Sequence, residues 1–276
     1  MLKYKYVIWS PGFNINSGGI LCLHYLCHLL NEIKHDAYIY YKNKENTKYN
    51  NYGLNIKIWP NHHVDDNTIV IYPEIVDHNP LNAKNIVRWL LHKPGFWTGR
   101  VNFGEKDLIV GYGEETSSKK FIINKQNILK IEYIMNDVYY NKNMSREHTC
   151  YSIRKSRKKS HDQHPKNSIC IDNKSHSEIN EIFNMSHTFI NYDPYSYFST
   201  YAVLCGCESI VIPDNGLSKE EWKPDITNRY GIAYGFDDLE YARATKYLLF
   251  TKIANQHNTN IEMVKNFTEL CKGYFI

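Results

Sequence analysis

The sequence predicts an α/β protein with two domains, each built on a parallel sheet with helices on both faces. Short apolar runs alternate with segments of helical periodicity, and turn-forming residues separate them. The chain has 276 residues, of which 42% are hydrophobic, so it is long enough for two lean cores. The boundary is expected in the polar, Asn-rich stretch 134–148, which gives domains at 1–140 and 141–276.

The first half of the chain alternates strands with helices. A helix is expected over 18–33, where five leucines make a broad apolar face. A second helix is expected to begin at Asn79-Pro80, with Asn as the cap and Pro at the first helical position, and to end near Lys93. Strands are expected at 4–9, 36–41, 55–59, 68–72, 107–112 and 128–131.

The most informative segment is 191–212, NYDPYSYFSTYAVLCGCESIVI. It predicts the end of a strand, an Asp193-Pro194 turn, a helix over 195–205 with hydroxyl groups in its first turn, a glycine stop and a core strand over 209–212. At the carboxyl edge of a parallel sheet, such a turn and helix N-terminus lie where nucleotides bind. The same pattern also occurs as plain scaffold in doubly wound domains.

This segment resembles the donor-binding motif of GT-B glycosyltransferases, in particular family 4-like C-terminal domains. That motif has an acidic residue, seven positions, a Glu-Ala pair, a Gly and a Val/Ile-rich strand. Asp193 takes the acidic position, and Tyr201 stands where the family has its ribose-binding Glu. The later positions are filled by Ala202, Gly206, Val211 and Ile212. The resemblance implies that Asp193 lies near the donor sugar or diphosphate, and that Tyr201, with Ser199 or Thr200 as substitutes, lies near the ribose.

A basic run, CYSIRKSRKKSH at 150–161, follows a short predicted strand. Such a run is often a solvated face, a localisation signal or a nucleic-acid patch. In GT-B enzymes, an Arg and a Lys after the first strand of the C-terminal domain clamp the donor diphosphate. The resemblance therefore implies that Arg154 and Lys158 bind the diphosphate, with Lys155 as the nearest substitute. Arg can chelate phosphate oxygens bidentately, whereas Lys acts as a point charge.

A glycine pair, Gly18-Gly19, opens the first predicted helix after the loop SPGFNINSGG. The spacing G-x-G-x-x-G is absent there, which disfavours a conventional NAD site. In GT-B enzymes the equivalent loop approaches the donor phosphates and the acceptor, so Gly18 and Gly19 become candidates for donor binding. A close contact between helix and strand explains the pair equally well.

Two residues of the first half are candidates for chemistry. Glu74 follows the predicted strand ending at Tyr72-Pro73, where a carboxylate at the sheet edge could act as a general base or orient the acceptor. His92 is the second candidate, at the expected C-terminus of a helix, although the helix dipole alone would favour a histidine there.

Composition narrows the remaining choices. The net charge of +4 is too mild for a chain that wraps nucleic acid but is compatible with an anionic membrane surface or a phosphorylated ligand. Seven scattered cysteines without C-x-x-C spacing indicate free thiols in a reducing compartment. The sequence has neither an 18-residue apolar stretch nor a signal peptide, so a cytoplasmic location is expected. D-x-D and zinc-ligand spacings are also absent, and neither a metal nor a cofactor is expected.

The sequence therefore predicts a metal-independent glycosyltransferase of polysaccharide biosynthesis. The GT-B resemblance implies two Rossmann-like domains facing each other across a cleft, with closing helices at 238–253 and 260–271, one of which crosses back to the first domain. The substrates would be a nucleotide-diphosphate sugar and a glycan or lipid-linked acceptor. Three alternatives remain: a non-catalytic sugar-nucleotide-binding protein, a sugar-nucleotide epimerase, and a basic nucleic-acid-binding protein.

Overall fold

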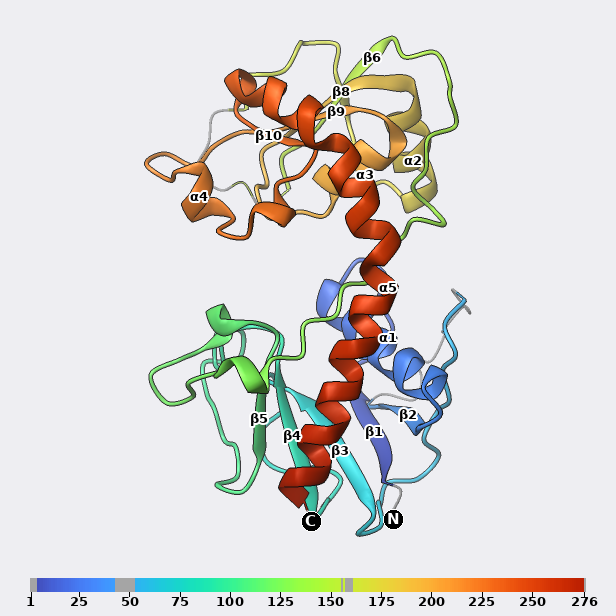
Figure 1. Cartoon of the computed structure of the whole chain (residues 1–276), viewed down its shortest axis with the longest axis vertical. Helices are drawn as coiled ribbons and strands as arrows, with labels where there is room; N and C mark the ends of the chain where they lie inside the picture. Colours follow the sequence, from blue (N-terminus) through green and yellow to red (C-terminus); the bar gives the residue numbers. More distant parts are fainter. Residues whose placement is uncertain (1–3, 43–52, 155, 157–160, 276) are drawn as a thin grey trace. The chain divides into compact units, whose positions relative to one another are not determined.

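A computed structural model describes residues 4–42, 53–154, 156 and 161–275. The chain divides into two compact units, which we call unit 1 (Met1–Tyr133 with Gln256–Ile276) and unit 2 (Ile134–Asn255). Each unit contains a parallel five-stranded sheet. The predicted α/β class, with two Rossmann-like domains, is confirmed (Figure 1).

The sheet of unit 1 has the order β2-β1-β3-β4-β5. Its strands are β1 (Lys5–Ser10), β2 (Asp36–Tyr41), β3 (Thr68–Pro73), β4 (Asn85–Leu90) and β5 (Leu108–Gly111). Helix α1 (Gly18–Glu32) connects β1 to β2, and the chain then crosses to the other side of β1 to form β3. The strand order therefore reverses between β1 and β3, which makes their carboxyl ends the topological switch point of this sheet.

The sheet of unit 2 has the order β10-β9-β8-β6-β7. Its strands are β6 (His148–Ser152), β7 (Ile169–Cys170), β8 (Ser186–Asn191), β9 (Glu208–Val211) and β10 (Ile232–Tyr234). Its helices include α2 (His176–Met185), α3 (Phe198–Cys205) and α4 (Lys219–Trp222). Counted from the first strand of each unit, this order is the same as in unit 1, so the second switch point lies between β6 and β8.

The two faces of the first sheet are covered differently. On one face, α1 and the C-terminal part of α5 (Leu239–Phe275) bury a large core, in which Leu26, Phe267 and Ile8 take part (Figure 1). On the other face, Val76 and Leu81 from the irregular β3–β4 connection cover the sheet. None of the described residues that form this second core lies in a helix, which differs from the expectation of helices on both faces.

The predicted helix from Asn79 to Lys93 is wrong, since residues 85–90 form strand β4. All six residues of β4 are buried, including Asn85 and Arg88, and a short strand that is buried on both faces shows no alternating pattern that would tell it from a buried helix. Asn79 organises a turn instead, because its Oδ1 accepts hydrogen bonds from the hydroxyl of Tyr72 (3.1 Å) and the N–H of Ala83 (2.9 Å). The predicted strands at 55–59 and 128–131 are reduced to single bridges, Ile39 to Ile58 and Gly111 to Ile128.

The two closing helices expected at 238–253 and 260–271 are one continuous helix, α5. The polar stretch between the expected helices contains neither Gly nor Pro, so nothing in it interrupts the backbone hydrogen bonds. Leu249 joins the core of unit 2, whereas Val264 and Cys271 join the core of unit 1. Asn260, fully buried in unit 1, accepts from the N–H of Glu132 (3.1 Å) and donates to its carbonyl (2.9 Å).

Candidate functional site

Each unit has a switch point where two neighbouring strands end at the carboxyl edge of its sheet. In unit 2, Ser152 at the end of β6 is the register partner of Asn191 at the end of β8. In unit 1, the corresponding exits are Ser10, at the end of β1, and Pro73, at the end of β3. Ligands of open α/β sheets bind outside such carboxyl ends, so the residues that follow them are the candidates.

The exit of β8 is organised by the buried side chain of Asn191. Its Nδ2 donates to the Oγ of Ser199 (2.8 Å), and its Oδ1 accepts from the N–H of Asp193 (3.0 Å). Asp193 Oδ1 in turn accepts from the N–H of Tyr195 (3.2 Å). These bonds fix the acidic turn relative to α3. The predicted site residue Ser199 is fully buried and holds this turn, while Asp193 is 7% exposed.

The other predicted ribose contacts lie in different surroundings. Tyr201 is 4% exposed and stacks on Tyr139, with ring centroids 4.2 Å apart and planes 6° apart, so its ring belongs to the core. Thr200 is half-buried. Tyr195 and Tyr197, which flank this turn, are 62% and 43% exposed and offer ring faces to a ligand. The sequence analysis missed both, although their place beside the Asp193 turn was a usable signal.

Trp222 in α4 supports the same turn. Its Nε1 donates to the carbonyl of Pro194 (2.8 Å), and its ring stacks on Tyr234 at 4.7 Å. Ser218 is the N-cap of helix α4 and forms a capping box with Glu221. A residue 28 positions away from Pro194 thus positions the acidic turn.

Replacing Trp222 with Phe keeps a ring against Tyr234 but removes the donor to Pro194. A buried carbonyl left without its partner costs about 1–3 kcal/mol, so we expect a lower urea midpoint, together with weaker binding of the nucleotide-sugar donor that the sequence resemblance implies. Trp59→Phe is the matched control, since its indole N–H donates to His63 in an exposed, longer bond (3.4 Å). Donor affinity that is unchanged in Trp222→Phe would contradict a positioning role.

The exit of β6 is fixed by Asp172, which follows β7. The Oγ of Ser152 donates to Asp172 Oδ1 (2.6 Å), and the N–H of Ile153 donates to Asp172 Oδ2 (3.0 Å). Arg154 comes directly after these bonds and is exposed. The predicted Lys155 and Lys158 lie outside the described residues. Asp172 was missed by sequence analysis, because its partners are some 20 positions earlier in the chain.

The β6–β7 connection also returns to the exit of β8. His164 stacks on Tyr151 (centroids 3.7 Å apart), and its Nδ1 lies 2.9 Å from the hydroxyl of Tyr192. Burial lowers the pKa of His164. The half-buried His164 side chain therefore lies between Tyr151 and Tyr192. Among the described residues, no group of three His, Cys, Asp or Glu side chains is arranged to hold a metal ion.

In unit 1, Glu74 follows β3 and is 5% exposed. Its Oε2 accepts from the N–H of Leu91 (3.0 Å), which ties it to the exit of β4. Burial raises the pKa of Glu74, and hydrogen bonds from backbone N–H groups, including those of Leu91 and His92, act in the opposite direction. A carboxylate with a raised pKa at a switch-point exit suits a general base.

The glycine pair lies at the same edge. A Cβ added to Gly19 would lie 3.6 Å from the Cδ1 of Leu91, and one added to Gly18 would meet nothing within 4 Å. Packing therefore does not require glycine at position 18. His92, the second catalytic candidate, follows β4 rather than ending a helix, and its ring contacts Phe96, with centroids 4.3 Å apart.

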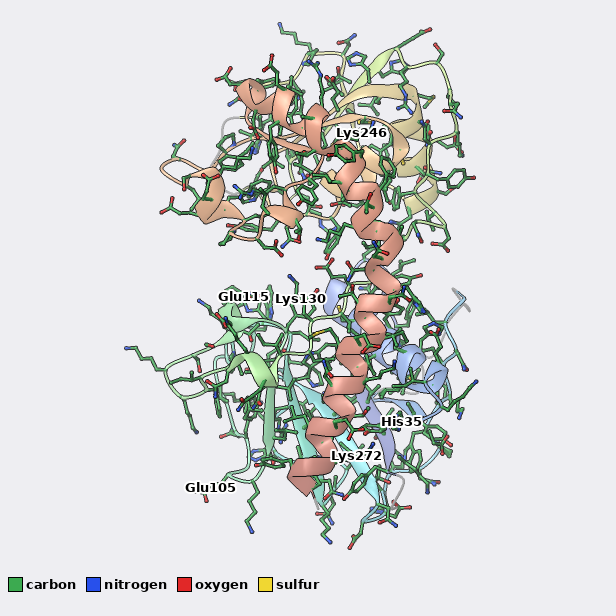
Figure 2. The ribbon with its side chains drawn as sticks, in the orientation of Figure 1. His35, Glu105, Glu115, Lys130, Lys246 and Lys272 are labelled. Atoms are coloured by element: carbon green, nitrogen blue, oxygen red, sulfur yellow. The ribbon has the colours of Figure 1, made fainter. Side chains whose placement is uncertain are left out.

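Charged side chains also mark the edges of this sheet. Figure 2 shows Glu115 and Lys130 at the carboxyl edge, near the exits of β1, β3 and β4, whereas Glu105 and Lys272 lie toward the opposite edge. Glu115 lies in a short 3-10 turn after β5, and Lys130 follows the bridge at Ile128. The sequence analysis singled out neither residue.

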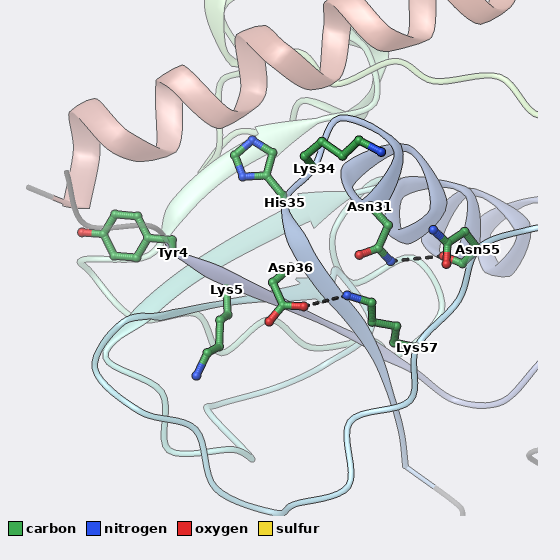
Figure 3. Close-up of a pocket in the computed structure, with 8 residues that line it drawn as sticks. All are labelled: Tyr4, Lys5, Asn31, Lys34, His35, Asp36, Asn55 and Lys57. Carbon is green, nitrogen blue, oxygen red and sulfur yellow. Dashed lines mark hydrogen bonds and ion pairs between the residues drawn. The ribbon is translucent and has the colours of Figure 1, made fainter.

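A pocket of about 490 Å³ lies at the amino edge, away from these exits (Figure 3). It is lined by Lys5 at the start of β1 and Asp36 at the start of β2. Two of its lysines are paired with carboxylates: Lys5 Nζ lies 3.0 Å from Asp65, and Lys57 Nζ lies 2.8 Å from Asp36. This pocket is therefore not part of the predicted site.

No protein-family model matches the chain, and no curated protein matches it. Two solved structures of T4 phage β-glucosyltransferase are similar to it. One is a complex with its UDP-glucose substrate, with 13% identity and a TM-score of 0.42, covering 98% of this chain and 97% of that chain. The other has 11% identity, a TM-score of 0.38 and the same coverage. Of the helices that the structure describes, none combines the length and the apolar character needed to cross a membrane.

Proposed function

We propose that this protein is a metal-independent glycosyltransferase of the GT-B type, which moves a sugar from a nucleotide-diphosphate donor to a glycan or lipid-linked acceptor. The main support is the placement of Arg154 and Asp193 after the two central strands of the unit 2 switch point. Glu74 and the Gly18 loop follow the equivalent strands of unit 1. The Arg154 cation and the Asp193 carboxylate, at neighbouring strand exits, suit the diphosphate and the sugar hydroxyls of a donor. The buried Glu74 carboxylate suits proton transfer.

The donor half of the proposal assigns the diphosphate to Arg154, with Lys155 and Lys158 as further cations. These groups neutralise the leaving diphosphate in place of a metal ion. Asp193 and Thr200 contact sugar or ribose hydroxyls, and the exposed Tyr195 ring stacks on the base. Ser199 and Tyr201 contribute by holding α3 in place.

The acceptor half assigns proton removal to Glu74. The acceptor oxygen forms a bond to the anomeric carbon, the bond from that carbon to the diphosphate oxygen breaks, and the acceptor proton moves to Glu74. The Gly18 loop lets backbone approach the substrates closely.

Donor binding is tested by thermal unfolding with nucleoside diphosphates and their sugars, UDP-glucose included. A donor at a hundred times its dissociation constant stabilises by about 2.7 kcal/mol. Arg154→Ala removes a charge-assisted bond worth about 1.5–3 kcal/mol, so we expect donor affinity to fall roughly 10- to 100-fold. Arg243→Ala is the control, since its exposed pair with Glu208 contributes little.

The outcomes separate the alternatives. Transfer of the sugar to an acceptor, detected by mass spectrometry, supports the proposal. Donor binding without transfer indicates a sugar-nucleotide-binding protein, and conversion of the donor sugar without an acceptor indicates an epimerase. Absence of a shift with every nucleotide and sugar tested would overturn the proposal.

A further inference from the structure

Two adjacent aromatic side chains stand exposed between β4 and β5. Phe96 is 61% exposed and Trp97 68%, and their ring centroids lie 4.8 Å apart. The ring of His92 lies 4.3 Å from that of Phe96 and 5.6 Å from that of Trp97. Because large aromatic side chains are usually buried, two that stay exposed side by side indicate a ligand-binding or partner-binding surface. We call residues 91–101 the aromatic loop.

Hydrogen bonds within the aromatic loop order it. The N–H of Gly99 donates to the carbonyl of Gly95 (2.8 Å), and both glycines have positive φ, 71° and 78°. The N–H of Phe96 donates to the carbonyl of Lys93 (3.2 Å), and Thr98 Oγ1 donates to the carbonyl of Arg100 (2.8 Å). The rings are therefore presented by a preorganised turn, which lowers the entropy lost on binding.

Both ends of the loop are anchored. At its start, the N–H of Leu91 donates to Glu74, the proposed base. At its end, Arg100 Nε lies 2.7 Å from Asp77 Oδ2, on the connection that begins with Glu74. Both ends of the aromatic loop are thus tied to the connection that begins with Glu74, so the loop is held at the exits of β3 and β4.

The charge of the loop selects among ligands. Arg100 is paired with Asp77, and Lys93 is the other Lys or Arg residue of the loop. Anionic membranes and nucleic acids are bound through clusters of several Lys and Arg residues. A neutral saccharide needs no such cluster, because one face of a sugar ring presents C–H groups to an aromatic ring while its hydroxyl groups stay in water.

We propose that Phe96 and Trp97 form a stacking platform for a sugar ring, and that the acceptor is a neutral saccharide. This inference rests on the proposed glycosyltransferase function, since it places the acceptor on the loop whose start is hydrogen-bonded to Glu74. Trp97 supplies the larger and more exposed ring, and Phe96 and His92 contact it at angles of 84° and 57° between the ring planes.

The test measures binding of neutral oligosaccharides of glucose, galactose and mannose by calorimetry, beside the nucleotide-sugar thermal shift. We expect Trp97→Ala to weaken saccharide binding roughly tenfold or more, and Trp97→Tyr to recover most of it. Tyr247→Ala is the matched control, because Tyr247 on α5 is 67% exposed. The nucleotide-sugar shift should stay unchanged in all of these variants.

The results distinguish the two proposals. Donor binding without any saccharide binding would overturn the platform and leave the transferase. Saccharide binding that is lost in Trp97→Ala, in a protein that binds no donor, would keep the platform and overturn the transferase. Binding to phosphatidylglycerol vesicles, or self-association, that is lost in Trp97→Ala without saccharide binding would assign the rings to a membrane or a second copy and overturn the platform.

Discussion

Replacing Glu74 with Gln is expected to lower turnover by about 10²- to 10⁴-fold, the usual contribution of a general base, while donor binding persists. Gln has nearly the same shape and can still accept the N–H of Leu91, so the exit of β4 keeps its position. It cannot take the acceptor proton. Single-turnover rates with saturating donor and acceptor measure the effect.

The pH dependence gives a second readout. Burial raises the pKa of Glu74, and only its ionised form is a base. The rate should therefore rise with pH through this raised pKa and level off above it. In Glu74→Gln, the rate should be slower and should no longer rise with pH in this range.

Stability should change with pH in the opposite sense. Because the folded-state pKa of Glu74 lies above the ordinary value of 4.5, its contribution to stability is full below that value and is lost as pH rises through the folded pKa. Urea unfolding between about pH 4 and pH 7 should show this loss in the wild type and less of it in Glu74→Gln.

Two variants serve as comparisons. Glu105→Gln changes an exposed carboxylate toward the opposite edge of the sheet and should leave turnover unchanged (Figure 2). His92→Gln tests the second catalytic candidate. Unchanged turnover in Glu74→Gln, together with a large loss in His92→Gln, would transfer the role of base to His92.

The sequence predicted those parts of the fold whose signals are local. In 191–212, the end of a strand, a proline turn, a helix and a glycine stop follow one another, and the structure has β8, α3 and β9 there. Gly206 ends α3 with a φ of 102°, a conformation that favours glycine.

The remaining parts depend on contacts that no local pattern encodes. Strand β4 was mistaken for a helix because a pairing partner on each side, not its own periodicity, makes it a strand. The bonds from Trp222 to Pro194 and from Ser152 to Asp172 join residues 28 and 20 positions apart. The sequence therefore predicted which strand exits carry the candidate site. It did not predict Trp222 and Asp172, the side chains that hold those exits in place.

The buried ion pair of Arg88 and Asp107 carries the second large prediction. The two side chains are 1% and 5% exposed, and Arg88 Nε lies 2.7 Å from Asp107 Oδ2. Arg88 also donates to the carbonyls of Val76 (2.8 Å) and His78, and its guanidinium lies 4.9 Å from the centroid of the Tyr72 ring. The ion pair therefore holds the β3–β4 connection, which begins with Glu74, against the sheet.

Arg88→Met is expected to destabilise the protein by about 3–5 kcal/mol, because Asp107 is left as an uncompensated buried charge and two carbonyls lose their donor. The double variant Arg88→Met/Asp107→Leu should recover much of this loss, since a buried pair replaced by apolar side chains of similar volume is often neutral. Lys84→Met is the control: its pair with Asp66 is 66% and 81% exposed and should change stability by less than about 1 kcal/mol.

Urea unfolding of the wild type, Arg88→Met, the double variant and Lys84→Met measures these changes in stability. If the double variant is as unstable as Arg88→Met, the stabilisation comes from the bonds to Val76 and His78 rather than from compensation of the Asp107 charge. A loss below about 1 kcal/mol in Arg88→Met would contradict the buried pair itself. If the two variants are equally unstable, turnover should also fall in both Arg88→Met and Arg88→Met/Asp107→Leu. Both variants lack the bonds from Arg88 that hold the connection beginning with Glu74.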